Sequence, residues 1–156
     1  SGSERSLRLS LGLAALEEGD DRQRPALGFT TTYKDRYVGN LYYWGRDQGP
    51  FHERNMLVSG MHSFSLVEKL HLTGALGAGI LYETLKLSYH DAPQDNDQEI
   101  NYNLGLAVRF AWHYDMGASF VLVHWDSYLF PAGINGGLLL STGRKQLIKA
   151  GIGVSL

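Results

Sequence analysis

The chain has 156 residues, a formal net charge of −2 and no cysteine. This length suits a single domain, and the lack of cysteine excludes disulfides and thiolate metal sites. No apolar run approaches the roughly 18 residues of a membrane-spanning helix, which excludes a helical membrane protein. The small net charge, without a basic stripe and interleaved aromatic residues, gives no support to nucleic acid as a partner.

The first predicted strand covers residues 6–16, where large apolar side chains alternate with small or polar ones. Successive side chains of a strand point to opposite faces, so this stretch has one apolar face. The apolar series is Leu7, Leu9, Leu11, Leu13 and Ala15, and the other series is Ser6, Arg8, Ser10, Gly12 and Ala14. A charged loop at residues 17–25 follows this strand.

Four more strands are predicted before residue 99, and short turns alternate with longer loops between them. The strands cover residues 26–33, 37–44, 55–66 and 70–87. The short turns are 34–36 and 67–69, and the longer polar loops are 45–54 and 88–98. In the fourth strand Leu57, Met61 and His62 interrupt the alternation, which predicts a bulge or a twist there.

Residues 99–113 give the clearest pattern of the chain. Large apolar side chains occupy every second position, namely Ile100, Tyr102, Leu104, Leu106, Val108, Phe110 and Trp112. The opposite face is small or polar and includes Arg109, which suits a crowded, hydrogen-bonded interior. An apolar face with Tyr102 and Trp112 near its ends is typical of lipid contact between two aromatic girdles. This stretch therefore predicts a transmembrane β-strand, with a turn at 114–115 after it.

The end of the chain is interpreted as one long hairpin that pairs residues 117–134 with residues 137–156. Asn135-Gly136 is a strong signal for a two-residue hairpin turn. A separate strand at residues 138–140 would make the number of strands odd, which single-chain bacterial barrels avoid. Pro131 removes a donor from the strand ladder, so this arm of the hairpin is expected to be irregular.

These elements predict an all-β fold, an eight-stranded antiparallel up-and-down transmembrane β-barrel with short periplasmic turns and longer extracellular loops. Residues 5–156 are assigned to this single domain, and residues 1–4 to a disordered N-terminal stub. The pattern resembles the small eight-stranded outer-membrane barrels, such as OmpX and the transmembrane domain of OmpA. The resemblance implies integral insertion in the outer membrane of a Gram-negative bacterium, with outer-membrane lipid and lipopolysaccharide as partners.

Four charged residues fall on positions that are expected to face the lumen, namely Arg8, Glu83, Arg109 and Lys149. The lumen of an eight-stranded barrel is just wide enough for side chains to fill. We therefore expect a plug of hydrogen bonds and ion pairs. The alternative is a gated ion path or a proton relay, which would make the protein a narrow ion channel.

His124, Asp126 and Ser127 are the candidate catalytic residues. His124 and Asp126 share a face, and the preceding Phe120 and Leu122 predict that this is the lipid face. A histidine near the outer headgroups could act as a general base on an acyl ester. The segment is similar to the lipid A deacylases, which carry His-x-Ser; here Asp126 stands at the serine position and Ser127 comes one residue later. The alternative is a polar girdle without catalysis.

Two further features point to the surface. Asp95, Asp97 and Glu99 supply alternating oxygen ligands, so this segment is a weak candidate for calcium binding. The glycine and the distal glutamate of a calcium hand are missing. The alternative interpretation is a solvated acidic loop. No other metal and no cofactor is expected.

The last hairpin would expose an apolar patch, which either marks an interaction surface or folds over the barrel mouth. Its residues are Leu129, Phe130, Ile134, Leu138 and Leu140.

The function predicted from these features is a surface-interaction or envelope-structural protein. It would act through its extracellular loops and protruding last hairpin on an extracellular protein or another surface ligand. A lipid A hydrolase with a lipid-facing site around His124 is the second hypothesis, and a narrow ion channel is the third. An enzyme is thus the less favoured interpretation.

Overall fold

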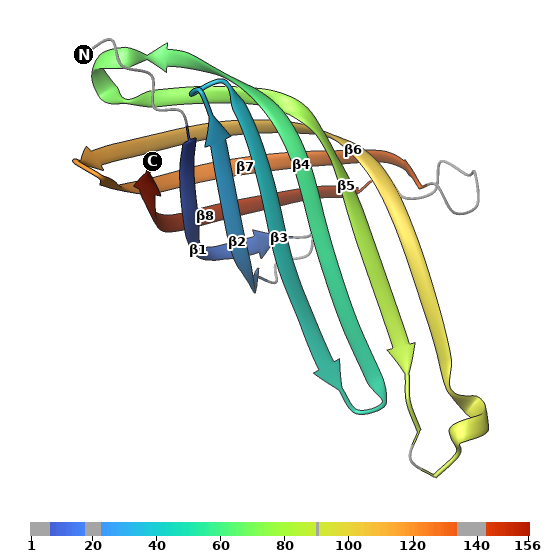
Figure 1. Cartoon of the computed structure of the whole chain (residues 1–156). Coiled ribbons are helices and arrows are strands. Elements are labelled where there is room, and N and C mark those ends of the chain that lie inside the picture. Colours follow the sequence, from blue (N-terminus) through green and yellow to red (C-terminus); the bar gives the residue numbers. More distant parts are fainter. Residues whose placement is uncertain (1–6, 18–22, 90, 134–142) are drawn as a thin grey trace.

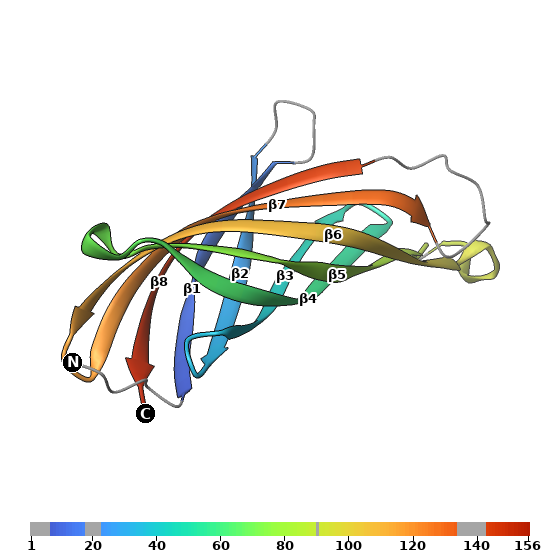
Figure 2. The same cartoon turned by 90° about the horizontal axis from the view of Figure 1, so that it is seen from above.

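The computed structural model describes residues 7–17, 23–89, 91–133 and 143–156, and the predicted stub at 1–4 lies outside them. The described residues form a closed antiparallel barrel of eight strands in chain order (Figures 1 and 2), which confirms the predicted fold class. The strands are β1 (Leu7–Glu17), β2 (Gln23–Tyr33), β3 (Tyr37–Gln48), β4 (Phe51–Val67), β5 (Leu72–Leu87), β6 (Asp97–Met116), β7 (Ser119–Gly133) and β8 (Gly143–Ser155). Two 3₁₀ turns, η1 (Glu68–Leu70) and η2 (Pro93–Asp95), lie between strands.

Pairing between β1 and β8 closes the barrel, from Arg8↔Ser155 to Glu17↔Gln146. Every other strand pairs with its neighbours in sequence. Closure satisfies the backbone donors and acceptors that lipid would leave without partners. Among the described residues, no helix is long and apolar enough to cross a membrane.

One end of the barrel, here called the short-turn end, carries three tight connections. Residues 34–36 join β2 to β3, with Lys34 and Asp35 at φ of 53° and 55°. The turn η1 and His71 join β4 to β5, and His71 has a φ of 54°. Gly117, at a φ of 85°, helps to join β6 to β7. The last turn lies beyond the predicted 114–115 because β6 stays paired as far as Met116↔Ser119.

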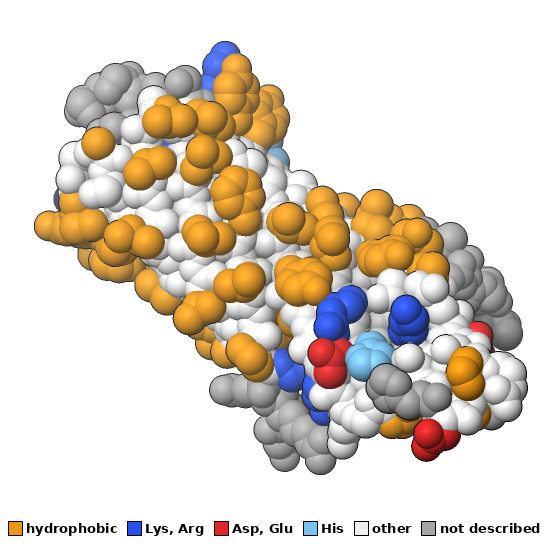
Figure 3. Space-filling model, turned by 60° about the horizontal axis from the view of Figure 1, so that its bottom comes forward, with side chains coloured by type: hydrophobic (Ala, Val, Ile, Leu, Met, Phe, Trp, Pro, Cys, Tyr) orange, Lys and Arg blue, Asp and Glu red, His pale blue; other side chains and the backbone are white. Residues whose placement is uncertain are grey.

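The outward face of the barrel is apolar and forms what we call the apolar belt. Its most exposed side chains include Leu13 at 69%, Leu106 at 62% and Ile152 at 63%. Further members are Leu11, Leu27, Val58, Leu76, Ile80, Leu104, Phe110 and Ile148. Hydrophobic side chains cover much of the molecule in Figure 3, whereas charged side chains gather toward one end. Such a surface suits contact with acyl chains.

The inward face combines small residues with large ones, as a narrow lumen requires. Gly28 lies beneath the Lys149 side chain, and a Cβ on Gly28 would stand 2.8 Å from Cδ of that lysine. A Cβ on Gly79 would likewise stand 3.2 Å from the Tyr128 ring. Several leucines fill the remaining space, namely Leu16, Leu57, Leu81 and Leu147.

The strands β3 to β6 run on past the ends of β1 and β2 (Figure 1). We call residues 45–54, 84–89 and 91–100 the protruding sheet. The predicted polar loop at 45–54 is wrong, because β3 and β4 stay paired from Gly45↔Arg54 to Gln48↔Phe51. Only Gly49 and Pro50 make the turn between them. Arg46, Asp47 and Arg54 are exposed on these strands, which explains why their sequence resembles that of a loop.

The irregularity predicted in the fourth strand lies further along the chain. Leu57 and Met61 face inward in an unbroken ladder, and the register shifts only between Ser65 and Val67. The hairpin signal Asn135-Gly136 lies outside the described residues. The strands that flank it, β7 and β8, are paired from Ser119↔Val154 to Phe130↔Gly143, as expected for the last hairpin.

Candidate functional site

A buried polar cluster crosses the middle of the lumen. Alternation along four strands turns its side chains inward, and all of them are at most 5% exposed. β3 supplies Asn40 and Tyr42, β4 supplies Ser59, β6 supplies Arg109, and β7 supplies His124, Asp126 and Tyr128. We call these residues the lumen cluster. They close the barrel with side chains at this level.

The centre of the lumen cluster is the ion pair of Arg109 with Asp126. The two residues are cross-strand partners on β6 and β7. Nε of Arg109 donates to Oδ1 at 2.6 Å, and Nη2 donates to Oδ2 at 2.7 Å. Their side chains are only 4% and 0% exposed. A buried charge is tolerated when it is paired and hydrogen-bonded in this bidentate way.

The Tyr42 hydroxyl connects this ion pair to the opposite side of the barrel. It donates to Oδ2 of Asp126 at 2.6 Å, and the hydroxyl oxygen itself lies 2.6 Å from Nε2 of His124. Tyr128 approaches Ser59 at 2.9 Å between hydroxyl oxygens. Each of these side chains thereby gains at least one partner, which offsets part of the cost of removing it from water.

Lys149 on β8 extends the polar lumen toward β1 and β2. Its Nζ donates to Oγ1 of Thr30 at 2.9 Å and to Oγ of Ser10 at 3.2 Å. Thr30 in turn donates to Asn40, so the lysine is joined to the lumen cluster through a hydroxyl. Lys149 is fully buried, and its hydrogen bonds are to neutral groups.

The predicted lipid-facing orientation of His124 and Asp126 is wrong, because both side chains lie in the lumen at 1% and 0% exposure. The error arose at Phe120, an apolar residue that faces inward and is 3% exposed. The outward series of β7 includes Val123 and Trp125, and Trp125 stacks on Phe110 of β6. His124 and Asp126 therefore have no access to an acyl ester in the bilayer.

Ser127 does not join the other two candidate catalytic residues. It follows Asp126 directly in β7, and adjacent strand residues point to opposite faces. The Arg109 side chain and the Tyr42 hydroxyl occupy the positions around Asp126 instead. Nδ1 of His124 has no hydrogen-bond partner in the described part of the chain. The three residues thus do not assemble into a nucleophile with a general base.

The four predicted lumen charges lie at three levels of the barrel. Arg109 and Lys149 are buried in the middle. Arg8 lies at the short-turn end, 3.4 Å from Asp35 and 3.5 Å from Asp115. Glu83 lies toward the protruding sheet, where Oε1 accepts a hydrogen bond from Asn103 at 3.1 Å. Arg8 and Glu83 thus lie toward opposite ends of the lumen, with Arg109 and Lys149 between them.

The predicted interaction hairpin is divided between the two faces of β7. Leu129 points outward and is 47% exposed, whereas Phe130 points inward, is 2% exposed and stacks on Tyr128. Phe130 thus does not belong to an exposed patch. Ile134, Leu138 and Leu140 lie outside the described residues.

The acidic residues proposed for calcium lie where η2 meets β6. Asp97 and Glu99 are exposed on β6, and Asp95 ends η2. Within the ranges that the structure describes, no group of three His, Asp or Glu side chains is close enough to hold a metal ion.

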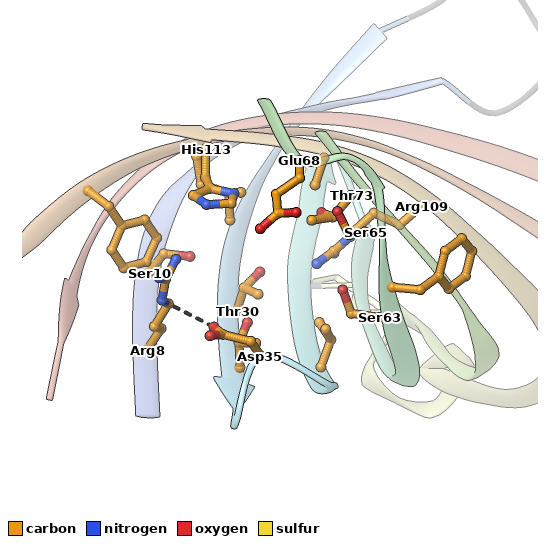
Figure 4. A pocket seen from close by; sticks show the side chains of 16 residues that line it. Arg8, Ser10, Thr30, Asp35, Ser63, Ser65, Glu68, Thr73, Arg109 and His113 are labelled. Carbon is orange, nitrogen blue, oxygen red and sulfur yellow. Dashed lines mark ion pairs between the residues drawn. The ribbon is translucent and has the colours of Figure 1, made fainter. Parts of the chain in front are cut away.

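A cavity of about 480 Å³ opens at the short-turn end. Figure 4 shows side chains from several strands pointing into it, with Arg8 and Asp35 on one side and Ser63, Ser65 and Arg109 on the other. Glu68 of η1 points into the cavity from above in this view. Arg109 belongs both to the cavity wall and to the lumen cluster, so the cluster forms the floor of the cavity.

The outward face of the protruding sheet carries a second polar group of residues. Arg54 donates from Nη1 and Nη2 to the two oxygens of Asp47, at 2.8 and 3.1 Å. Nδ1 of His52 lies 3.0 Å from Oδ1 of the same carboxylate. The hydrogen bonds from Arg54 and His52 lower the pKa of Asp47 to about 2. Lys86 lies beside His52 on β5.

The inward face of the protruding sheet is joined to β2 by an ion pair. Nη1 of Arg24 donates to both carboxylate oxygens of Glu53, at 3.0 and 3.1 Å. Burial acts to raise the pKa of Glu53, but hydrogen bonds from Asn55 and Arg24 outweigh it, so this pKa is lowered. Phe51 remains 47% exposed on β4.

Sequence reasoning missed Tyr42, Asn40, Ser59 and Tyr128 as members of the lumen cluster. Tyr42 is followed by Tyr43 and Trp44, and three consecutive aromatic residues hide which of them face inward. The polar alternation of Asn40 in β3 and Ser59 in β4 was visible. Their shared position around Arg109 depends on strand register and barrel closure, which no local pattern contains.

Comparisons with known proteins give no match to any protein-family model and none to any curated protein. Solved structures do match. The attachment invasion locus protein Ail of Yersinia pestis, in complex with the heparin analogue sucrose octasulfate, aligns at a TM-score of 0.63 and 11% identity, over 99% of this chain and 100% of Ail. Neisserial surface protein A aligns at a TM-score of 0.55 and 12% identity, over 99% and 98% of the two chains.

The N-terminal β-barrel domain of Pseudomonas aeruginosa OprF aligns at a TM-score of 0.52 and 14% identity, over 96% of this chain and 97% of that domain. All three are small eight-stranded outer-membrane barrels. Identities this low are informative about the fold alone. The chain therefore has the fold of the small eight-stranded outer-membrane β-barrel proteins.

Proposed function

We propose that the protein is an integral outer-membrane protein of a Gram-negative bacterium that binds a ligand at the cell surface through its protruding sheet. The apolar belt would lie among the acyl chains of outer-membrane lipid and lipopolysaccharide. The short-turn end would face the periplasm, and the protruding sheet would face the outside, as is usual for such barrels. The lumen cluster makes the barrel a closed anchor.

The observation that carries this proposal is the continuation of four paired strands beyond the apolar belt. Tyr43, Met56, Tyr82 and Tyr102 are successive cross-strand partners. Interfacial aromatic residues of this kind flank the apolar band of outer-membrane barrels. The paired ladders continue past this row to Gln48↔Phe51 and Leu87↔Asp97, and in this orientation they would hold charged side chains well outside the bilayer.

The outward face of the protruding sheet favours an anionic ligand. Arg54 and His52 contact the carboxylate of Asp47 there, and Lys86 lies beside His52 on β5. Arg54 and Lys86 lie just beyond the aromatic row, where sulfate or phosphate groups of a surface ligand would reach them. Ail, which shares this fold, was solved with a heparin analogue bound, so sucrose octasulfate is a rational first probe.

The orientation can be tested with single cysteines, since the chain has none of its own. Lys86→Cys should react with a membrane-impermeant maleimide on intact cells. Asp35→Cys, in a short turn, should react only after the outer membrane is permeabilised. The reverse labelling pattern, or labelling of neither position after lysis of the outer membrane, would contradict the proposed topology.

Ligand binding can be tested by calorimetry with sucrose octasulfate and the refolded barrel in detergent micelles. The double variant Arg54→Gln, Lys86→Gln should weaken binding about tenfold or more, since each charged contact contributes over 1 kcal/mol when well formed. The matched control is Lys34→Gln, Arg36→Gln at the short-turn end, which should leave the affinity unchanged. Equal losses in both double variants would show nonspecific charge attraction and contradict a site on the protruding sheet.

The other two functions expected from the sequence gain no such support. The lumen position of His124 removes the geometric basis for a lipid A hydrolase. The lumen cluster spans the barrel without interruption from Tyr42 to Asp126, which does not favour an ion path. Planar-bilayer recordings should accordingly show no discrete conductance steps.

A further inference from the structure

The cavity at the short-turn end has the size and chemistry of a ligand site. Its volume of about 480 Å³ lies within the range of roughly 300–1,000 Å³ that is usual for small-molecule pockets. It opens at the end of the barrel opposite the protruding sheet, so its role is independent of the surface binding proposed above.

The inner wall of the cavity has an excess of positive charge. Arg109 uses Nε and Nη2 for Asp126, and its Nη1 makes no hydrogen bond to any residue of the described chain. Lys149 lies behind Ser10 and Thr30, two hydroxyl residues of the cavity wall. Two buried cations therefore face one buried carboxylate at this level, and a donor group of Arg109 is left toward the cavity.

Among the charged side chains that line the mouth of the cavity or pair with its lining, carboxylates outnumber cations. Asp35 and Asp115 both lie beside Arg8, at 3.4 and 3.5 Å. Glu68 adds a third carboxylate, and within the described ranges it has no ion-pair partner. Its carboxylate points into the cavity (Figure 4). Within the cavity lining a charge gradient thus runs from carboxylates at the mouth to cations at the floor.

The walls between floor and mouth are rich in hydroxyl groups. Ser63, Ser65 and Thr73 line the cavity together with Ser10 and Thr30. Hydroxyl groups can both donate and accept hydrogen bonds, so they suit the amide and carboxylate groups of a polar ligand. The apolar part of the lining consists of Val38, Phe64, Ala111, Phe120 and Leu122.

We propose that this cavity binds a small zwitterion with a free carboxylate and a free ammonium group, namely an α-amino acid or a short peptide. The carboxylate would lie at the floor, where Nη1 of Arg109 can donate to it. The ammonium group would lie near Glu68 at the mouth. A ligand with both charges matches both ends of the gradient, whereas a simple anion or cation matches only one end.

The test uses glycylglycine and two matched analogues. N-acetylglycylglycine lacks the ammonium group, and glycylglycinamide lacks the carboxylate. Amide chemical shifts of Ser63, Ser65 and Thr73 are followed by NMR on the refolded barrel in micelles. Glycylglycine should give saturable shifts in the millimolar range or below, and each analogue should bind at least about tenfold more weakly. Equal binding of all three, or no saturable shift, would overturn the proposal.

Glu68→Gln separates the proposed contact from general electrostatics. Since Glu68 is exposed on a turn, the variant should fold, which a heat-modifiable gel shift would verify. It should bind glycylglycine about tenfold more weakly and lose the preference over the N-acetyl analogue. The matched control Glu99→Gln, on β6 in the protruding sheet, should keep both. An unchanged preference in Glu68→Gln would contradict the assigned orientation of the ligand.

A cavity-filling variant provides an independent check. Ala111 lines the cavity and is 7% exposed, so Ala111→Phe should occupy the space near the floor. Glycylglycine binding should disappear while the barrel still shows its gel shift. Retained binding in the folded variant would place the ligand elsewhere and overturn the proposal.

Discussion

Arg109 on β6 and Asp126 on β7 face each other across paired strands and form a bidentate ion pair that is almost wholly screened from solvent. Charges at this depth are stable only together, because either one alone would remain desolvated without a partner. The pair also anchors Tyr42 and His124, so its removal affects the whole lumen cluster.

Asp126→Ala should therefore lower the free energy of unfolding by about 3–5 kcal/mol, since it leaves the buried Arg109 charge without its carboxylate. Urea unfolding in lipid vesicles, followed by tryptophan fluorescence, measures this change. The double variant Arg109→Met, Asp126→Leu should be markedly more stable than Asp126→Ala. A double variant that is less stable than the single one would contradict the uncompensated charge as the cause.

Tyr42→Phe should lower the free energy of unfolding by about 1.5–3 kcal/mol, because it removes the hydroxyl that donates to a buried carboxylate. The matched control is Tyr43→Phe, whose ring is 43% exposed on the outward face. The same unfolding assay should detect little change in the control. Similar losses in both variants would indicate a role of ring packing and not of the lumen hydrogen bond.

Gly77→Ala should impair folding much more than Gly60→Ala, although the two glycines lie on the neighbouring strands β5 and β4. A Cβ on Gly77 would overlap the backbone oxygen of Gly60, whereas a Cβ on Gly60 meets no atom within 4 Å. The yield of the heat-modifiable species after refolding measures the difference. Equal yields would show that the two strands can separate locally at little cost.

The Asp47 carboxylate should titrate with a pKa of about 2, lowered from 3.8 by hydrogen bonds from Arg54 and then His52. A lowered folded-state pKa stabilises the folded form above the unfolded pKa, and this stabilisation is lost as the pH falls from 3.8 through about 2. NMR titration of the carboxyl carbon measures it. Arg54→Gln should move the midpoint up toward 3.8, and an unmoved midpoint would exclude Arg54 as the main cause.

The strands of the barrel could be predicted from the sequence because lipid and lumen impose opposite demands on alternate residues. Residues 99–113 show this most clearly, and β6 has the predicted facing, with Leu106 outward and Arg109 inward. Prediction failed at Gly45–Arg54, where solvent surrounds both faces of the sheet. No alternation is required there, so a paired ladder has the composition of a loop.

The candidate site was less predictable than the fold. The facing of β7 was wrong because apolar residues also line parts of the lumen, as Phe120 does beside Arg8 at a ring-centroid distance of 5.6 Å. Apolar character alone therefore does not identify the lipid face. The contact of Tyr42 with Asp126 joins residues 84 positions apart, and it follows only from closure of the barrel.

The Tyr42 hydroxyl also has a mechanical consequence. β3 and β7 stand half a circumference apart in a ring of eight strands, so the bond from Tyr42 to Asp126 acts as a strut along a diameter. A hollow cylinder of this width could flatten into an ellipse when lateral pressure in the bilayer rises. The strut resists that deformation, and the barrel should keep a round cross-section in membranes of different lipid packing.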